Sequence, residues 1–423
     1  MMSNCVRNFV VLLIFAFSVQ SYAQYDQQKV FQFLEDTYNQ HDKYLTDVLI
    51  SDLIQYLVMF PKSPNAPRVQ QILASVYSEK RKDDEAIASY IKMFCLYPEI
   101  SNVAGSSDDL RQLVAKDKSY SDKKDWLFGL LDKSVPNRSL VDAYYQYLSI
   151  LVDLEQKGLQ EWTLDACRDF IEHFPDEARN EQVLRWMGDV YLLKKDYREA
   201  ELMYNKYSFL YPGNTNLPAI LVKQSRIDYE NLHQDEKAQS ILQGLITDHP
   251  NSEAIPDALF LRAQIFTDLK NYKEAVAINR RLVDSYPDHA KVIDALLAIV
   301  DIDQDKLKDY PATIAVLNEI VEKTKDNQKG IDALEEMAKL YEREEKNYPA
   351  TAETYARIAE LYPTYEKASD RLLDAGEICE RKMDDYQKAI SYYQMVLDKF
   401  PTNEKAEDAR GKIEKAQEKL NKK

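Results

Sequence analysis

The chain has 423 residues but only nine glycines, and it is 45% hydrophobic and 30% charged. Loops that cradle phosphate groups need several glycines close together, so a nucleotide-binding enzyme of that kind is not expected. The 55 Lys and Arg residues against 71 Asp and Glu give a net charge of −16. Because no basic stripe stands apart from the acidic residues, nucleic acid is disfavoured as a partner.

The segment 1–23 has the pattern of a secretory signal peptide. Arg7 precedes an apolar run from Phe9 to Val19, and Ser21-Tyr22-Ala23 has the small-x-small pattern of a cleavage site. The run is too short to span a bilayer, so no membrane span is expected. Cys5 lies before the run, which disfavours lipid attachment after cleavage. We therefore expect export, with a mature chain from Gln24 that is periplasmic or associated with the outer membrane of a bacterial host.

From position 24 onward the sequence is punctuated at nearly equal intervals by an aromatic or similar residue followed by Pro, and one interval is twice as long as the others. In that long interval a repeat without its Pro ends near Lys325, where Lys325 to Gly330 is expected to supply a polar turn. Ten units thus fit residues 24–401, and such a fixed period is typical of a solenoid. The punctuating prolines are Pro61, Pro98, Pro136, Pro175, Pro212, Pro250, Pro287, Pro363 and Pro401.

Each unit holds two stretches with helical spacing of apolar residues, joined by a polar turn. Several first stretches open near a Pro, as at Pro67 and Pro218. Second stretches open with Asp196 or Asn271 followed three residues later by Glu, a pattern that predicts a capping box. Small residues predict close helix crossings, in the pairs Ala74 with Ala86, Gly188 with Ala200, Ala263 with Ala275 and Gly376 with Ala389.

The segment Met187-Gly188-Asp189-Val190-Tyr191, followed by Ala200, Tyr204 and Pro212, resembles the tetratricopeptide repeat. The resemblance is weak in the units 24–61, 99–136 and 137–175. The longer period and the turn between units look similar to periplasmic repeat proteins of bacterial outer-membrane assembly and of the Tol-Pal system. This resemblance implies an all-α, right-handed solenoid of about ten helical hairpins, in which the first helices line the concave face and the second helices the convex one.

After the last unit, residues 402–423 carry a narrow apolar stripe at helical spacing, from Ala406 to Leu420. A helix with one apolar stripe can cover the exposed end of a solenoid, so we expect a capping helix and tail. A coiled-coil dimer seam is the alternative.

Residues with catalytic or metal-binding chemistry are sparse. The five histidines show no i, i+4 pair, and no Gly-x-Ser-x-Gly elbow is present. Asp301-Ile302-Asp303-Gln304-Asp305 begins like a calcium loop, but Lys306 stands where Gly is needed. No catalytic residue, cofactor or metal is predicted. Three cysteines remain after export, Cys95, Cys167 and Cys379, and three buried free thiols are favoured over one disulfide.

The resemblance places the family's inner-face positions on polar residues of the first helices, and these form the candidate peptide-binding groove. Solvated side chains without a partner are the competing interpretation. The groove residues are Arg185, Asp189, Lys223, Glu230, Gln264, Asp268, Glu335, Lys339, Arg343, Glu377 and Arg381.

The function predicted from these patterns is an exported scaffold or adaptor of the cell envelope that binds partner proteins or peptides on its concave face. Partners among envelope or outer-membrane proteins fit this hypothesis. A surface accessory protein that captures nutrients or glycans is the alternative, and an enzyme with an unrecognised site ranks last. The sequence leaves the partner and the oligomeric state open.

Overall fold

The computed structural model describes residues 26–42, 44–98, 105–131, 138–324 and 326–422. The predicted signal peptide lies outside these residues. The described chain is all-α and has the architecture of a tetratricopeptide-like α-solenoid, so the predicted fold class is confirmed. None of the helices in these ranges is long and apolar enough to cross a membrane.

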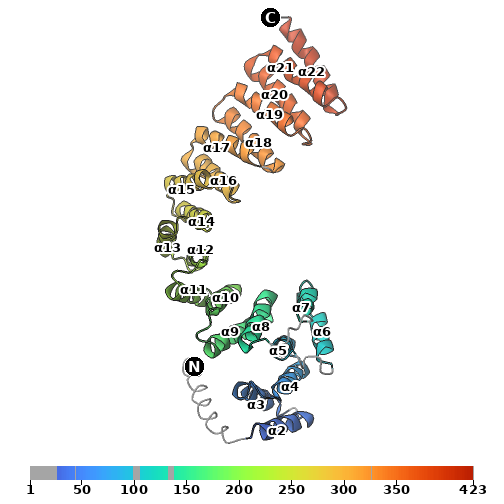
Figure 1. Ribbon diagram of the computed structural model, residues 1–423. Coiled ribbons are helices and arrows are strands. Elements are labelled where there is room, and N and C mark those ends of the chain that lie inside the picture. The colour runs from blue at the N-terminus through green and yellow to red at the C-terminus, as the bar shows by residue number, and fades with distance from the viewer. Residues whose placement is uncertain (1–25, 43, 99–104, 132–137, 325, 423) are drawn as a thin grey trace. The chain divides into compact units, whose positions relative to one another are not determined.

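The chain divides into two compact units, Met1–Gly213 and Asn214–Lys423. In the first unit, helices follow one another in pairs with short turns between them (Figure 1). The helices of this unit are α2 Gln27–Asn39, α3 Thr46–Met59, α4 Ala66–Glu79, α5 Asp83–Leu96, α6 Ser106–Lys116, α7 Lys124–Leu131, α8 Leu140–Leu154, α9 Gln160–His173, α10 Asn180–Leu193 and α11 Tyr197–Leu210, with the 3-10 turns η1 Lys118–Tyr120 and η2 Lys157–Leu159.

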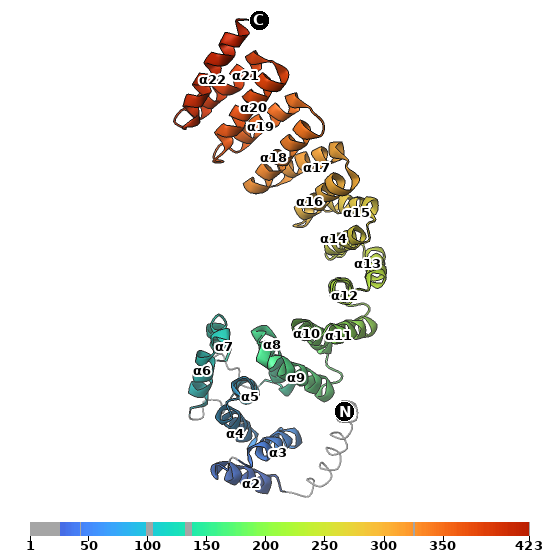
Figure 2. The ribbon, with the colours of Figure 1, turned by 180° about the vertical axis from the view of Figure 1, so that it is seen from behind.

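The second unit contains five more pairs and a last single helix, α22, which packs on α20 and α21 (Figure 2). The predicted capping helix is confirmed, with Ala406, Ala409 and Ala416 as its buried stripe. The helices of this unit are α12 Leu217–Glu230, α13 Asp235–Asp248, α14 Ile255–Asp268, α15 Tyr272–Ser285, α16 Val292–Ile302 continued by the π-helix η3 Asp303–Leu307, α17 Tyr310–Lys323, α18 Asn327–Arg343, α19 Tyr348–Leu361, α20 Ala368–Met383, α21 Tyr386–Lys399 and α22 Lys405–Leu420.

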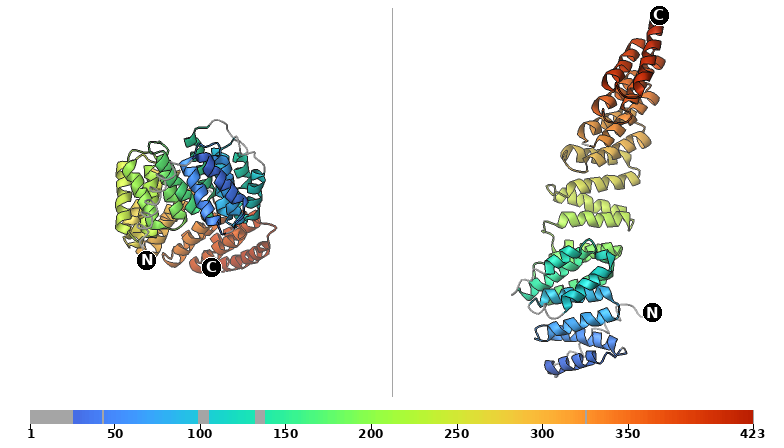
Figure 3. Two further views of the ribbon diagram at one scale, coloured as in Figure 1. Left: turned by 90° about the horizontal axis from the view of Figure 1, so that it is seen from below. Right: turned by 90° about the vertical axis from the view of Figure 1, so that its right-hand side faces the viewer.

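Within each unit, the second helix of a pair packs on the first helix of the next, as between α3 and α4 or α13 and α14 (Figure 3). The pair α4–α5 departs from this pattern. Both α6 and α7 pack on α5, and α8 packs on α5 as well. Of the weak unit predicted at 99–136, the described helices α6 and α7 are therefore an addition at the side of α5, and the stack resumes on the same helix with α8.

Small residues allow the close crossings that the sequence predicts. Ala74, Ala86, Ala200 and Ala389 are fully buried. A Cβ atom built on Gly188 would lie 2.4 Å from the Tyr204 ring, and one on Gly376 would lie 2.2 Å from the Tyr393 ring. Each of these two glycines therefore makes room for a buried tyrosine of the following helix.

Two predictions about turns are wrong. Gly330 is expected in a turn but lies inside α18, where a Cβ atom would be 1.9 Å from the Tyr362 hydroxyl. Asp196 and Asn271 cap no helix through their side chains. In a capping box, the Glu side chain accepts a hydrogen bond from the backbone N–H of the N-cap residue. Here that N–H already has a partner, because Asp196 N donates to the Tyr191 carbonyl at 2.9 Å and Asn271 N donates to the Phe266 carbonyl at 2.8 Å.

The turn inside a pair has a feature that the sequence patterns did not reveal. The residue just before the second helix's N-cap has a positive φ in seven pairs, although none of these residues is Gly. Left-handed backbone is costly for residues with a side chain, so the scarcity of glycine leaves strain at these turns. The seven residues are Arg81, Lys195, His233, Lys270, Lys308, Lys346 and Asp384.

The same turns also explain why some repeats are one residue longer than others. In the shorter repeats the N-cap amide donates to the carbonyl five residues earlier, as from Lys82 to Tyr77 at 2.9 Å. In the longer repeats it donates six residues back, as from Asn347 to Tyr341 at 2.8 Å and from Asp385 to Cys379 at 3.0 Å. The extra residue is therefore placed in the turn within the pair, and both helices keep their positions in the repeat.

Candidate functional site

All eleven groove residues predicted from the sequence lie on first helices. Arg185 and Asp189 lie on α10 in the first unit, and the other nine lie in the second unit. Those nine are Lys223 and Glu230 on α12, Gln264 and Asp268 on α14, Glu335, Lys339 and Arg343 on α18, and Glu377 and Arg381 on α20.

In the first unit, the two predicted residues differ in how they are engaged. The Tyr204 hydroxyl donates a hydrogen bond of 2.6 Å to Asp189, so this carboxylate holds a core tyrosine. The Nε atom of Arg185 is buried and has no hydrogen-bond partner among the described residues. Most buried polar groups are hydrogen-bonded, so an unpartnered donor such as the Arg185 Nε atom is unusual.

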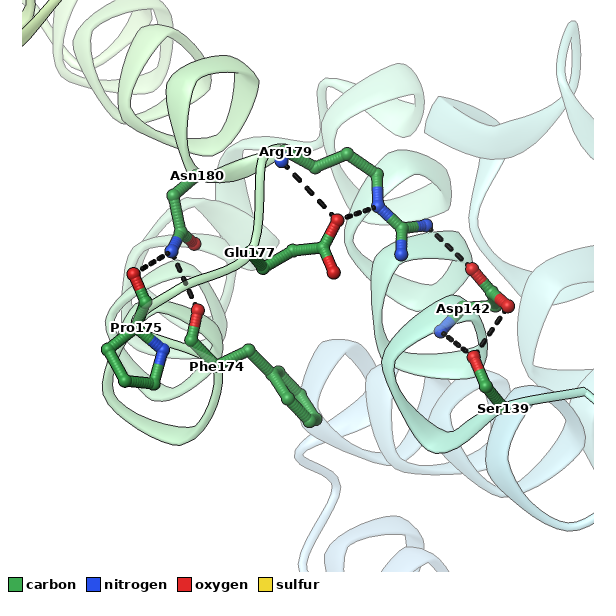
Figure 4. A network of polar contacts seen from close by, with 7 residues as sticks. All are labelled: Ser139, Asp142, Phe174, Pro175, Glu177, Arg179 and Asn180. Atoms are coloured by element: carbon green, nitrogen blue, oxygen red, sulfur yellow. Dashed lines mark hydrogen bonds and ion pairs between the residues drawn. The ribbon is translucent and has the colours of Figure 1, made fainter.

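The junction between α8 and α10 in the same unit is fixed by a polar network (Figure 4). The Arg179 guanidinium donates to Glu177 at 2.7 Å and to Asp142 at 2.8 Å, and it lies 4.7 Å from the ring centre of Tyr145. The Ser139 side chain caps α8 by accepting from the Asp142 amide. Hydrogen bonds from Ser139 and Arg179 lower the pKa of Asp142.

Asn180 completes this junction from the first residue of α10. Its side-chain amide donates to the carbonyls of Phe174 and Pro175 at 2.7 and 3.1 Å. The turn between the two pairs is therefore held by the Asn180 amide, and the contact from Arg179 to Asp142 ties it to α8 (Figure 4).

In the second unit, several of the predicted acidic residues tie one repeat to the next. Glu335 on α18 accepts from Arg371 on α20 at 2.6 Å, and Glu377 on α20 accepts from Lys412 on α22 at 2.7 Å. Asp268 on α14 accepts from the Tyr229 hydroxyl on α12. These carboxylates therefore contribute to the stack and are not free for a ligand.

Arg371 makes one of these contacts with a guanidinium that also donates to Asp374 at 2.6 Å. Burial disfavours its charge, but its hydrogen bonds to Glu335 and Asp374 outweigh that effect and raise its pKa. The guanidinium also lies 5.5 Å from the ring centre of Tyr355. Such a forked, stacked arrangement is specific to Arg and would be lost with Lys.

Lys339 and Arg343 lie together at a hollow of about 180 Å³ between the end of α16 and α18. Polar and charged side chains dominate its wall, with three basic and three acidic residues. The lining residues are Gln304, Asp305, Lys308, Tyr310, Glu336, Lys339, Leu340, Arg343 and Glu344. Two of the groove residues predicted from the sequence therefore lie together at one concavity.

Glu336 organises the floor of this hollow. It accepts hydrogen bonds of 2.9 Å from Gln304 and from Lys339. Burial opposes its ionisation, but these two hydrogen bonds outweigh burial and lower its pKa. The carboxylate is therefore ionised at neutral pH and orients the Lys339 ammonium, whereas Arg343 forms no ion pair among the described residues.

Sequence reasoning missed the α16 side of this hollow. The π-helix Asp303–Leu307 and the left-handed Lys308 bring Gln304, Asp305 and Lys308 to the hollow. π-Helical turns are rare and often occur at functional sites. The run from Asp301 to Asp305 was visible in the sequence, but its only recognisable pattern was that of an incomplete calcium loop. Among the described residues, no group of three His, Cys, Asp or Glu side chains is arranged to hold a metal.

A comparison with protein families identifies the repeat itself. The tetratricopeptide repeat model matches residues 257–289, which cover most of α14 and all of α15, and residues 372–403, which cover most of α20 and all of α21. The chain contains tetratricopeptide repeats. Repeats of this type form extended binding surfaces for proteins and are generally scaffolds rather than enzymes.

Several solved structures are similar to the chain at low sequence identity. A tetratricopeptide repeat protein from Parabacteroides merdae is 18% identical and covers 65% of this chain and 98% of its own, with a TM-score of 0.37. PilF of Pseudomonas aeruginosa is 16% identical over 54% of this chain and 95% of its own, with a TM-score of 0.37. PilW, a type IV pilus biogenesis factor, is 11% identical over 64% of this chain and 99% of its own, with a TM-score of 0.30. No curated protein matches the sequence.

Proposed function

We propose that this protein is an exported scaffold of the bacterial cell envelope, which binds partner proteins or peptides on the first-helix faces of its tetratricopeptide repeats. The observation that carries the proposal is the hollow between α16 and α18, where Lys339 and Arg343 lie together on a first helix. A peptide with a carboxylate could pair with Arg343, which forms no ion pair among the described residues, while Glu336 holds Lys339 in place.

The binding role can be tested by charge reversal. The variant K339E/R343E is expected to weaken capture of partners at least tenfold in envelope extracts, measured by quantitative crosslinking and mass spectrometry. The matched control is K273E/R281E, which makes the same two changes on exposed residues of the second helix α15. Equal capture by both variants would remove this hollow from the binding site.

A second charge reversal examines the unit that lacks the hollow. The variant R185E changes the side chain on α10 that retains a buried, unpartnered donor among the described residues. If the two first-helix faces bind different proteins, the partners that R185E no longer captures should differ from the partners that K339E/R343E no longer captures. Loss of the same partners in both variants would indicate that the two faces share their ligands.

The envelope location rests on the apolar run Phe9 to Val19 and the small-x-small pattern at Ser21-Tyr22-Ala23. Fractionation of bacteria should recover the protein outside the cytoplasm, with an N-terminus at Gln24. A chain in which Leu12 and Leu13 are both replaced by Arg should stay in the cytosol, because the apolar run is broken. Recovery of the unchanged chain in the cytosol alone would contradict export.

A further inference from the structure

On the second helix of each pair, two positions form what we call the outward row. They lie two and nine residues before the C-cap residue of that helix. In eight of nine second helices, both positions are exposed. They hold Ser51 and Val58 in α3, Asp165 and Glu172 in α9, Leu202 and Phe209 in α11, Ser240 and Thr247 in α13, Ala277 and Asp284 in α15, Ala315 and Glu322 in α17, Glu353 and Glu360 in α19, and Ser391 and Asp398 in α21.

Helix α5 is the exception, because its outward row is buried by other helices of the chain. Ala88 is fully buried and Cys95 is 3% exposed. Cys95 lies in a small hollow with Leu130 and Leu131 of α7 and Gln146 of α8. An outward row with small apolar side chains is thus covered by helices that pack across it.

Helix α3, one repeat earlier, carries a similar row that no described residue covers. Val58 corresponds to Cys95, Ser51 to Ala88 and Ile54 to Ile91, with the same separation of one repeat in each case. Ile91 is fully buried, whereas Ile54 is 36% exposed and Val58 is 44% exposed.

The exposed apolar stripe continues toward the start of α3. Val48 is 57% exposed and Leu45, just before the helix, is 41% exposed. At about 100° per residue, Val48 lies on the same half of the helix surface as Ile54 and Val58, whereas Leu45 lies on the side opposite Ile54. The 14 residues of α3 extend about 21 Å, the length of a four-turn helix laid along it.

The charges near this stripe indicate what chemistry would complement it. Helix α3 contains two acidic residues, Asp47 and Asp52, and no Lys, Arg or His. Asp47 pairs with Lys80 of α4, which leaves Asp52 without an ion pair among the described residues. Helix α7, which helps to cover α5, has two lysines at its start, Lys123 and Lys124. Anionic lipid surfaces require basic side chains, which α3 lacks, so a membrane is disfavoured.

The size of the stripe distinguishes a helix from a folded second copy. A stable interface between two proteins takes about 800 Å² from each partner. Val48, Ile54 and Val58, which are 57%, 36% and 44% exposed, offer much less than this area. One amphipathic helix, which binds through anchors spaced three and four residues apart, fits the stripe.

We propose that the outward face of α3 is a docking site for a short amphipathic helix of a partner protein, with Leu or aromatic anchors and basic residues beside them. This site is separate from the first-helix hollow. A variant of the hollow, K339E/R343E, is expected to leave it intact, so failure of one proposal is distinguishable from failure of the other.

The probe for this site is a synthetic, helix-stabilised peptide with the sequence of residues 121–134, which contains α7 and the two lysines at its start. Binding to the full chain is measured by the anisotropy of a fluorophore on the peptide. The variant I54Q/V58E introduces residues that other repeats carry at these positions, Gln243 and Glu172. The control variant L202S/F209D makes similar changes on α11, where both residues are also exposed.

We expect one peptide to bind each chain, at least tenfold more weakly to I54Q/V58E and unchanged to L202S/F209D. A peptide with Glu in place of its two N-terminal lysines should bind more weakly than the original. Absence of binding to the unchanged chain, or equal binding to I54Q/V58E, would overturn the proposal. Circular dichroism melting curves check that both variants remain folded.

One further result would assign the face to another occupant and would also overturn the proposal. A dimer in analytical ultracentrifugation that I54Q/V58E dissociates would identify a second copy.

Discussion

The two units use the same repeat, but their second helices differ in the outward row. In the second unit every such position is small or polar, from Ser240 on α13 to Asp398 on α21, and the stack proceeds regularly to α22. In the first unit the row carries apolar side chains on three helices. These side chains are exposed on α3 and α11 and buried on α5. A polar outward row therefore accompanies plain stacking, whereas the apolar row of α5 is covered by α7 and α8.

The largest expected effect comes from placing a charge in the buried row. The variant C95D would bury a carboxylate against α7 and α8, and we expect it to lower the free energy of unfolding by at least about 3 kcal/mol. The variant V58D places the same charge at the same repeat position on α3, where it stays exposed, and should change stability by less than about 0.5 kcal/mol. Urea denaturation followed by circular dichroism measures both. Equal losses would show that the outward rows of α3 and α5 do not differ in burial.

Close helix crossings should behave alike in both units. The variants G188A and G376A each force a Cβ atom into a buried tyrosine ring, at a cost of about 1–3 kcal/mol in the free energy of unfolding. The control is G244A on α13, where nothing outside the helix's own backbone lies within 4 Å of the added carbon. Ala favours helix more than Gly does, so this variant should gain up to about 1 kcal/mol. A loss in G244A as large as in G376A would contradict the steric explanation.

The buried thiols predict how the protein responds to alkali. All three described cysteines are free and buried, as the sequence predicted. Burial raises the pKa of Cys95 and Cys167 in the first unit to about 12, and that of Cys379 in the second to about 11, from an ordinary value of 9.0. Because folding favours the neutral thiols, their contribution to stability is complete below pH 9 and is lost as the pH rises toward 11 or 12.

Thiol reactivity tests this expectation and compares the units. With Ellman's reagent at pH 8, the three thiols should react only after denaturant is added. As the pH is raised, Cys379 should begin to react at a lower pH than Cys95 and Cys167. Mass spectrometry of the labelled peptides distinguishes them, and rapid labelling of Cys95 at pH 8 would contradict its burial beneath α7 and α8.

The smallest effect concerns a feature that the units share. Lys195 and Lys270 have φ values of 63° and 60° in turns of the same type, one in each unit. Replacing either with Gly relieves left-handed strain but adds freedom to the unfolded chain, so we expect a gain of about 0.5 kcal/mol or less. Thermal unfolding should show similar shifts for K195G and K270G. A loss in either variant would mean that the Lys side chain stabilises its turn by more than the strain costs.

The sequence was sufficient to predict the repeat, because its signals are local. An aromatic residue before Pro ends a helix, and small residues such as Gly188 and Ala200 mark crossings, whatever the rest of the chain does. The burial of α5 was harder to anticipate, because it depends on which helix packs against Ala88 and Cys95. Their apolar character was a signal, but it could equally have marked an exposed patch like that on α11.

The candidate site was only partly predictable for a similar reason. The repeat pattern placed all eleven residues on first helices, yet it could not show that Glu335 and Glu377 would be engaged by Arg371 and Lys412 from the next repeat. Nor could it reveal the π-helix that carries Gln304 to Glu336. These contacts depend on side chains that belong to different repeats and on a turn that differs from the α-helical spacing.

The turn inside each pair has a consequence for how this gene can change. Its closing hydrogen bond spans either five or six residues, as at Lys82 and at Asn347, and the following helix begins correctly in both cases. A codon gained or lost at this point alters only the turn, so natural variants that differ by one residue there should fold and keep their binding surfaces. Removing one residue between Glu344 and Lys346 would convert a six-residue closure into a five-residue one. Elsewhere in a helix, the same deletion would rotate every later side chain by about 100° and expose the core.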